Sequence, residues 1–96
     1  MFITGQLYNI TRDYFRQVND HIKISINTNE NVKVILILNA ECILNNKNEL
    51  NLIETYLQKG ILPTITAEYV EQYENYFVNI NKKITYNINK IKVINN

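Results

Sequence analysis

His21 and Cys42 are the only histidine and the only cysteine of the chain. An imidazole activates a thiol only within hydrogen-bond reach. Cys42 stands among apolar residues, where a free cysteine usually behaves as a small hydrophobe, and a single cysteine makes no internal disulfide. One histidine, one cysteine and scattered acids do not give zinc-ligand spacing. We therefore predict no catalytic residue, no metal site and no cofactor, and a minimal enzyme around His21 is the least favoured alternative.

The sequence also lacks a glycine-rich phosphate-binding loop, since its only glycines are Gly5 and Gly60. Arginines and lysines are better candidates for holding an anion. Two arginines four residues apart would share one face of a helix that we expect at about 12–20, and guanidinium groups suit phosphate or carboxylate partners. The candidate anion-binding residues are Arg12, Arg16, His21, Lys23, Lys82 and Lys83.

The stretch EYVEQYENYF, residues 68–77, carries three tyrosines and three glutamates in ten positions. Read as a helix, it buries Val70, Tyr73 and Phe77 and leaves an acidic, tyrosine-rich surface. Tyrosine is enriched in the cores of protein interfaces. The candidate partner-binding residues are Glu68, Tyr69, Glu71, Glu74 and Tyr76.

The first half of the chain must supply a strand, a short helix and a hairpin. Residues 1–10 alternate as a strand, and Thr11 is a suitable N-cap for the helix at about 12–20. Residues 21–39 form the clearest hairpin, with isoleucines alternating with polar residues before an Asn-rich turn. The apolar run that follows this turn is typical of a central strand.

The second half adds helices and another hairpin. Asn48 should cap a helix over 49–59, with Gly60 just beyond its end. Thr66 should cap the helix that contains 68–77, and 77–94 should form a hairpin with a bulge or turn at Asn89-Lys90. The expected fold class is α+β: a small, mostly antiparallel sheet of two hairpins plus an N-terminal strand, with about three helices packed on one face. We expect one compact domain, 1–96.

Composition limits the function further. Asn and Ile each make up about one residue in six, a bias expected of a low-GC genome. No apolar run is long enough to cross a membrane and the N-terminus does not resemble a signal peptide, so we expect a cytoplasmic protein, in the host cytoplasm if it is viral. The leading hypothesis is a small non-enzymatic inhibitor or regulator, anti-defence or immunity-like, that binds a partner protein or itself as a homodimer. The net charge of +1 is a weak nucleic-acid footprint, so nucleic-acid or nucleotide-ligand binding through the arginines and C-terminal lysines is the alternative.

Overall fold

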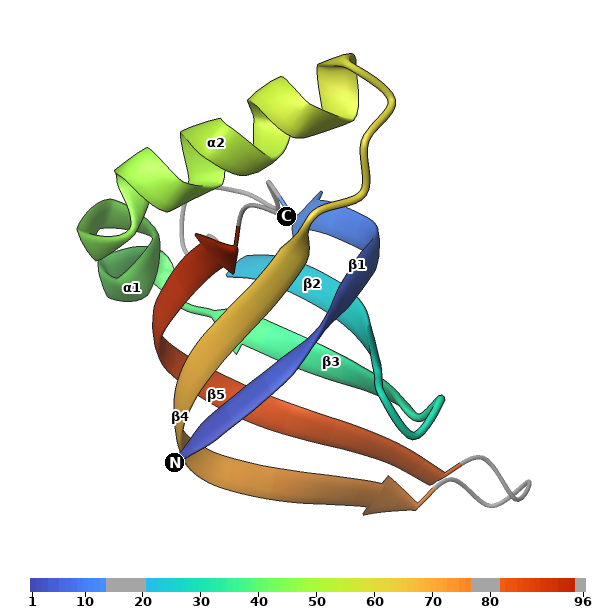
Figure 1. Cartoon of the computed structure of the whole chain (residues 1–96). Coiled ribbons are helices and arrows are strands. Elements are labelled where there is room, and N and C mark those ends of the chain that lie inside the picture. Colours follow the sequence, from blue (N-terminus) through green and yellow to red (C-terminus); the bar gives the residue numbers. More distant parts are fainter. Residues whose placement is uncertain (14–20, 77–81, 95–96) are drawn as a thin grey trace.

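The computed structural model describes residues 1–13, 21–76 and 82–94. This part of the chain contains five strands and two helices (Figure 1). In chain order they are β1 (Phe2–Asp13), β2 (His21–Thr28), β3 (Lys33–Leu38), α1 (Ala40–Asn45), α2 (Lys47–Gln58), β4 (Thr64–Tyr76) and β5 (Lys82–Ile94).

The five strands close into a barrel in the order β1-β2-β3-β5-β4. All neighbouring pairs are antiparallel except β3 and β5, which run parallel. Three consecutive strands are followed by β4, which returns through α1 and α2 to lie beside β1, and this is a Greek key. A five-stranded Greek-key barrel is the architecture of the OB-fold.

β1 holds the barrel together because it pairs with two strands in succession. Its first residues pair with β4 and its later residues with β2, and Gly5 pairs with both Ile65 and Thr28. A Cβ atom on Gly5 would lie 2.7 Å from the backbone oxygen of Asn27. Glycine is therefore required where β1 passes from one partner strand to the other.

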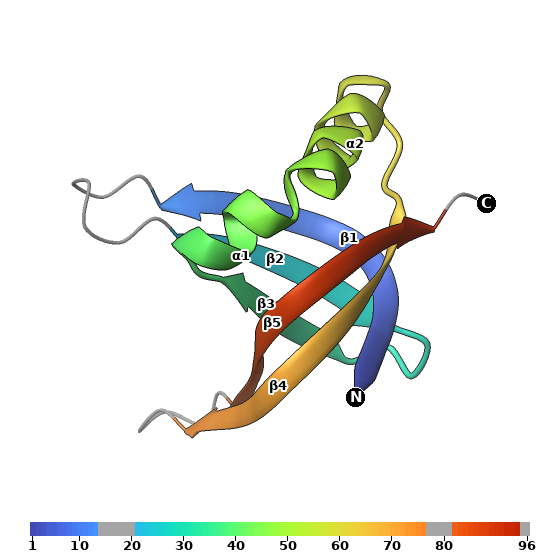
Figure 2. The same cartoon turned by 90° about the vertical axis from the view of Figure 1, so that its left-hand side faces the viewer.

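The barrel interior is filled by branched aliphatic side chains, as expected for a small barrel. Inward residues alternate along the strands and are joined by two residues of α2. The two helices lie across one end of the barrel in both views (Figures 1 and 2). The fully buried residues include Leu7, Ile22, Ile24, Ile26, Leu36, Leu38, Ile53, Ile65 and Ile91.

The expected α+β class is wrong, because the described chain is a closed, mostly β barrel with two short helices. The largest error is the helix placed over 68–77, since residues 64–76 form β4. Ile65, Ala67 and Tyr69 turn inward at a spacing of two. The register shifts on either side of Tyr69 then break the alternation. The tyrosines of this stretch also recur in the sequence at spacings that resemble a helical stripe, which is why a helix was expected.

The helix expected at about 12–20 is also wrong at its start, because Arg12 and Asp13 belong to β1. Residues 14–20 lie outside the described residues. The other expectations fare better. The 21–39 hairpin is confirmed as β2 and β3, the irregularity near Asn89 is present, and the expected 49–59 helix appears as α2. Its N-cap is Asn46 instead of Asn48, and Gly60 has the positive φ of 74° expected beyond a helix end.

Candidate functional site

The outer surface of β1, β2 and β3 is the part of the barrel with the most suggestive chemistry. Side chains from the three strands lie next to one another there because Asn9 pairs with Ser25, and Asn27 pairs with Lys33. We call this surface the three-strand face, and it consists of Tyr8, Asn9, Lys23, Ser25, Asn27 and Lys33.

Tyr8 reaches the surface through an irregularity in β1. The β1–β2 register shifts between Leu7 and Asn9, so Tyr8 is the extra residue. Such bulges redirect side chains. Tyr8 is 43 % exposed, and the Nζ of Lys33 lies 5.1 Å from its ring centroid. This is a cation–π contact, which holds an ammonium group beside an accessible aromatic face.

The charge on this face is positive. β2 and β3 contain no Asp or Glu, whereas each contributes one exposed lysine, Lys23 and Lys33. Asn27 Nδ2 donates to Asn31 Oδ1 at 2.9 Å, while the buried Asn27 Oδ1 has no hydrogen-bond partner among the described residues. The three-strand face thus offers cations, an aromatic ring and polar donors to a ligand, with no acid from β2 or β3.

His21 and Cys42 line the same hollow of about 480 Å³, between the end of the β2–β3 hairpin and α1. The structure therefore brings the chain's histidine and cysteine into one neighbourhood. Burial raises the pKa of the Cys42 thiol above its ordinary value, and the charge of Glu41 acts in the same direction. The thiol is accordingly protonated at neutral pH, which is the opposite of an activated nucleophile.

The remaining predicted anion-binding residues are dispersed. Arg12 pairs through its backbone with Ile22, and Arg16 lies outside the described residues. The expected helical face shared by the two arginines does not form, because Arg12 is in a strand. Lys82 and Lys83 begin β5 opposite Tyr76 and Asn75, and their side chains lie outside the described part.

The predicted partner-binding residues all lie on β4. Tyr69 packs against Tyr86, with ring centroids 4.5 Å apart, and contacts the core. Glu68 Oε1 accepts a hydrogen bond from Asn89 Nδ2 at 3.3 Å. The three other members are placed only by backbone register, opposite residues of β5; they are Glu71, Glu74 and Tyr76.

Within residues 68–77, Val70 was expected in the core, and this is wrong because Val70 is 67 % exposed. Val70 is skipped by the register between Tyr69 and Glu71, so it is the extra residue of a bulge. Of the other two expected core residues, the side chain of Tyr73 and the whole of Phe77 lie outside the described part.

Sequence reasoning missed Tyr8 and Lys33 as a pair. The polar alternation of 21–28 did indicate a solvated face. Tyr8 joins it only through the pairing of β1 with β2 and the shift after Leu7. Neither feature has a local sequence signal.

Within residues 1–13, 21–76 and 82–94, no three His, Cys, Asp or Glu residues gather as metal ligands would. No helix in the described ranges is long and apolar enough to span a bilayer. Comparison of the chain with protein-family models, curated proteins and solved structures found no match.

Proposed function

We propose that the protein binds single-stranded nucleic acid on the three-strand face. The observation that carries the proposal is the exposed ring of Tyr8 with the Nζ of Lys33 5.1 Å from its centroid. Proteins bind single strands by stacking bases on aromatic rings while cations follow the phosphate backbone. Tyr8 would stack on a base, and Lys23 and Lys33 would contact phosphates.

The position of this face in the barrel supports the same function. OB-folds bind oligonucleotides and oligosaccharides on the face of strands 2 and 3 and on the neighbouring loops. A shared fold does not determine function, so the local chemistry has to agree. Two lysines and the absence of acids from β2 and β3 favour an anionic chain over a neutral sugar.

A single strand suits this protein better than a duplex. The net charge of +1 limits the number of phosphates that the chain can neutralise, and duplex binding without base contacts depends on such neutralisation. An unpaired base adds stacking, which contributes about 1–3 kcal/mol per base. The proposal includes the cytoplasmic location expected from the sequence.

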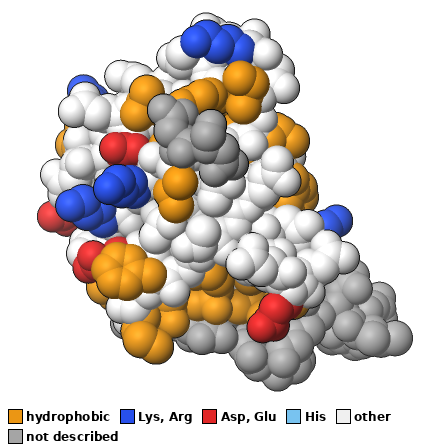
Figure 3. Space-filling view, viewed as in Figure 1, with side chains coloured by type: hydrophobic (Ala, Val, Ile, Leu, Met, Phe, Trp, Pro, Cys, Tyr) orange, Lys and Arg blue, Asp and Glu red, His pale blue; other side chains and the backbone are white. Residues whose placement is uncertain are grey.

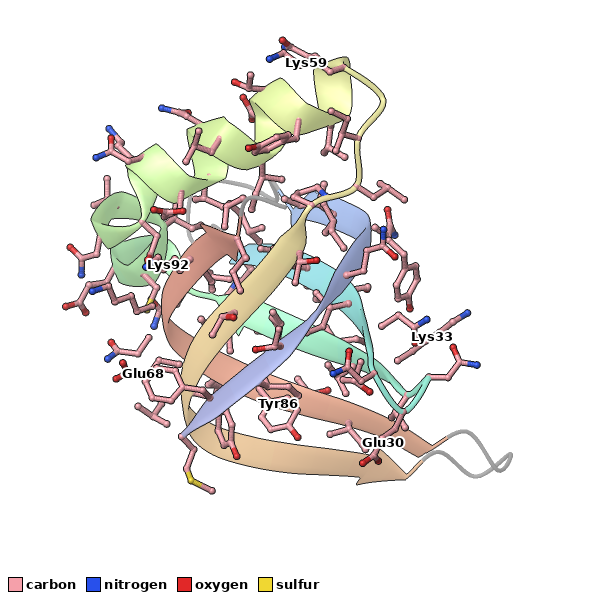
Figure 4. All side chains as sticks on the ribbon, in the orientation of Figure 1. Glu30, Lys33, Lys59, Glu68, Tyr86 and Lys92 are labelled. Atoms are coloured by element: carbon pink, nitrogen blue, oxygen red, sulfur yellow. The ribbon has the colours of Figure 1, made fainter. Side chains whose placement is uncertain are left out.

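Fluorescence anisotropy with labelled oligothymidylate and oligouridylate of about 12 nucleotides tests the proposal, with a duplex of equal length as comparison. We expect binding at low salt, weaker binding to the duplex, and affinity that falls as salt is raised. Lys33→Ala should weaken binding, whereas Lys59→Ala, at the C-cap of α2, should not. The two variants carry the same net charge, and Figure 4 shows these lysines far apart. Absence of binding at low salt, or equal weakening by both variants, would reject the proposal.

The start of β1 favours a second candidate function, in which the protein associates with itself through an unpaired sheet edge. The Tyr69 N–H donates to the Met1 oxygen at 2.9 Å, so the backbone groups of Phe2 and Thr4 point away from β4. Pairing with β2 begins only at Gly5. Among the described strands, none meets Phe2 and Thr4 on that side, and such edges accept an added strand.

A hollow of about 500 Å³ lies beside this edge, lined by Ile3, Val34, Ile84 and Tyr86 among others. Phe2 at its rim is 70 % exposed, and hydrophobic side chains gather along the lower edge of the molecule in Figure 3. We propose β1 of a second copy as the occupant, since two identical edges can pair about a two-fold axis. The regulatory or inhibitory role expected from the sequence would use the same edge, with a partner protein's strand in place of the second copy.

Sedimentation equilibrium of Thr4→Pro and Thr4→Ala tests this second candidate. Proline removes a backbone N–H that faces the open edge and leaves the β4 side of the ladder intact. We expect wild type and Thr4→Ala to dimerise and Thr4→Pro to be monomeric with an unchanged circular dichroism spectrum. A monomeric wild-type protein at high concentration would refute the dimer.

A further inference from the structure

Two hollows are bordered by α1 and β5, and Asn45 lines both of them. The first, of about 480 Å³, begins at His21 and Ile37, and Ile37 is the β3 register partner of Lys23 on the three-strand face. The second, of about 500 Å³, lies between the start of α2 and β5. We call the two hollows together the α1 groove, which extends from beside the three-strand face to Lys92 on β5.

The second hollow is basic. It is lined by Lys47, Lys90 and Lys92, and none of these ammonium groups has an ion pair or hydrogen bond among the described residues. Its acid, Glu49, is already engaged, because Glu49 Oε2 accepts the Val93 N–H at 2.8 Å. Figure 4 shows Lys92 beside the helices, on the opposite side of the molecule from Lys33.

The first hollow is rich in amides. Asn39, Asn87 and Asn89 line it in addition to Asn45, and its acid is Glu41. Amide side chains both donate and accept hydrogen bonds, which matches the edges of unpaired bases. The α1 groove thus offers amides first and lysines further along.

The walls of the α1 groove are held in place by Asn46, which is 5 % exposed. Its Nδ2 donates to the backbone oxygens of Cys42 at 2.6 Å and Asn89 at 3.3 Å. Its Oδ1 accepts the Ile91 N–H at 3.1 Å. These bonds fix the α1–α2 junction to β5, so the groove is formed before a ligand arrives and binding need not order it.

We infer that a bound single strand leaves the three-strand face past His21 and continues along the α1 groove, where Lys47, Lys90 and Lys92 contact its phosphates. The inference rests on the proposed function and extends it to a longer site that wraps around α1. Charge complementarity selects this ligand, because the hollow lined by three lysines adjoins the amide-lined hollow at Asn45. A single strand is flexible enough to turn around the helix, whereas a duplex is stiff over this distance.

A length series of oligothymidylates separates the two parts of the site. An oligomer of about 5 nucleotides should occupy only the three-strand face, and one of about 15 should also fill the α1 groove. Replacing Lys90 and Lys92 by Ala should weaken binding of the longer oligomer and reduce its slope of log K against log salt by about 0.7 for each phosphate that is no longer neutralised. Binding of the short oligomer should not change. Lys92→Ala can be compared with Lys59→Ala, which carries the same net charge and lies outside the groove.

Backbone amide shifts give an independent readout, since those of Asn45 and Lys92 should move with the longer oligomer and not with the shorter one. If both oligomers bind and the Lys90/Lys92 variant binds the longer one with unchanged slope, the groove inference is overturned and the three-strand face stands. If the wild-type protein binds neither length at low salt, the proposed function is overturned and the groove inference with it.

Discussion

β2 and β4 flank β1 on its two sides and resemble each other inside the barrel, but their outer surfaces differ in charge. β2 buries three isoleucines at alternate positions, and β4 buries Ile65 and Ala67 at the same spacing. Outward, β2 presents Lys23 and Ser25, whereas β4 presents Thr66 and Glu68. The whole of β2 lacks an acid, and β4 contains three glutamates. Both strands thus place apolar side chains inside the barrel, while their described outward charges are opposite, Lys23 on β2 and Glu68 on β4.

The aromatic residues follow the same division. On the β2 side Tyr8 is exposed beside Lys33, so its ring is available to a ligand. On the β4 side Tyr69 is packed against Tyr86 and the core. A tyrosine in this barrel is therefore exposed or packed according to where a bulge places it, and residue type alone does not distinguish the two positions.

The largest effect is expected at Gly5, where β1 joins the two sides. A Cβ atom there would lie 2.7 Å from the Asn27 oxygen and 3.1 Å from Ile26 Cδ1. The closer atom belongs to the backbone and cannot rotate away. Gly5→Ala should lower the free energy of unfolding by about 3 kcal/mol, as overpacking does at tight sites, and urea denaturation would measure this.

Gly60→Ala is the matched comparison for that change. Among the described residues nothing lies within 4 Å of a Cβ at Gly60, and only its positive φ of 74° opposes a side chain. We expect a smaller loss of about 1 kcal/mol there. Equal losses at the two glycines would mean that the close approach of β1 and β2 at Gly5 does not add to the cost of a side chain there.

Tyr8→Ala should have the next largest effect, this time on binding. Loss of a stacked base costs about 1–3 kcal/mol, which is about 5- to 150-fold in the dissociation constant for oligothymidylate. Tyr8→Phe keeps the ring and should bind nearly as wild type does. Leu52→Ala removes an exposed side chain from α2, outside the α1 groove, and should leave affinity unchanged, so a loss there as large as at Tyr8 would contradict a specific role for Tyr8.

Much of the fold follows from local signals in the sequence. The 21–39 hairpin was predictable because Ile22, Ile24 and Ile26 alternate with polar residues up to an Asn-rich turn, and all three are buried. The α2 helix was predictable because Leu50 and Ile53 share its buried face and Gly60 ends it. In both cases the pattern and the tertiary structure impose the same periodicity.

Barrel closure and the candidate site depend on contacts between residues far apart in sequence. Residues 68–77 were assigned to a helix from the spacing of their tyrosines, and propensity gives no warning of the bulge at Val70 that interrupts the period of two in β4. Tyr8 meets Lys33 only because β1 and β3 both pair with β2. Cys42 and His21 share a hollow for a similar reason, namely that α1 begins where the hairpin ends.

The smallest effect tests whether position or net charge governs binding. Lys33→Ala should reduce the salt slope by about 0.7 if Lys33 holds one phosphate. Glu68→Gln removes one negative charge from β4 and keeps an oxygen to accept the Asn89 amide. The double variant Lys33→Ala/Glu68→Gln therefore has the wild-type net charge, with one charge fewer on each side.

Anisotropy titrations at several salt concentrations would compare the double variant with each single variant. If the three-strand face holds the ligand, the double variant keeps the reduced slope of Lys33→Ala with an oligomer of about 5 nucleotides, because such an oligomer does not reach Glu68 and its register partner Lys90. Full recovery of wild-type affinity and slope would show that only the summed charge matters. In that case the opposite charges of β2 and β4 would not direct the ligand to one side of β1.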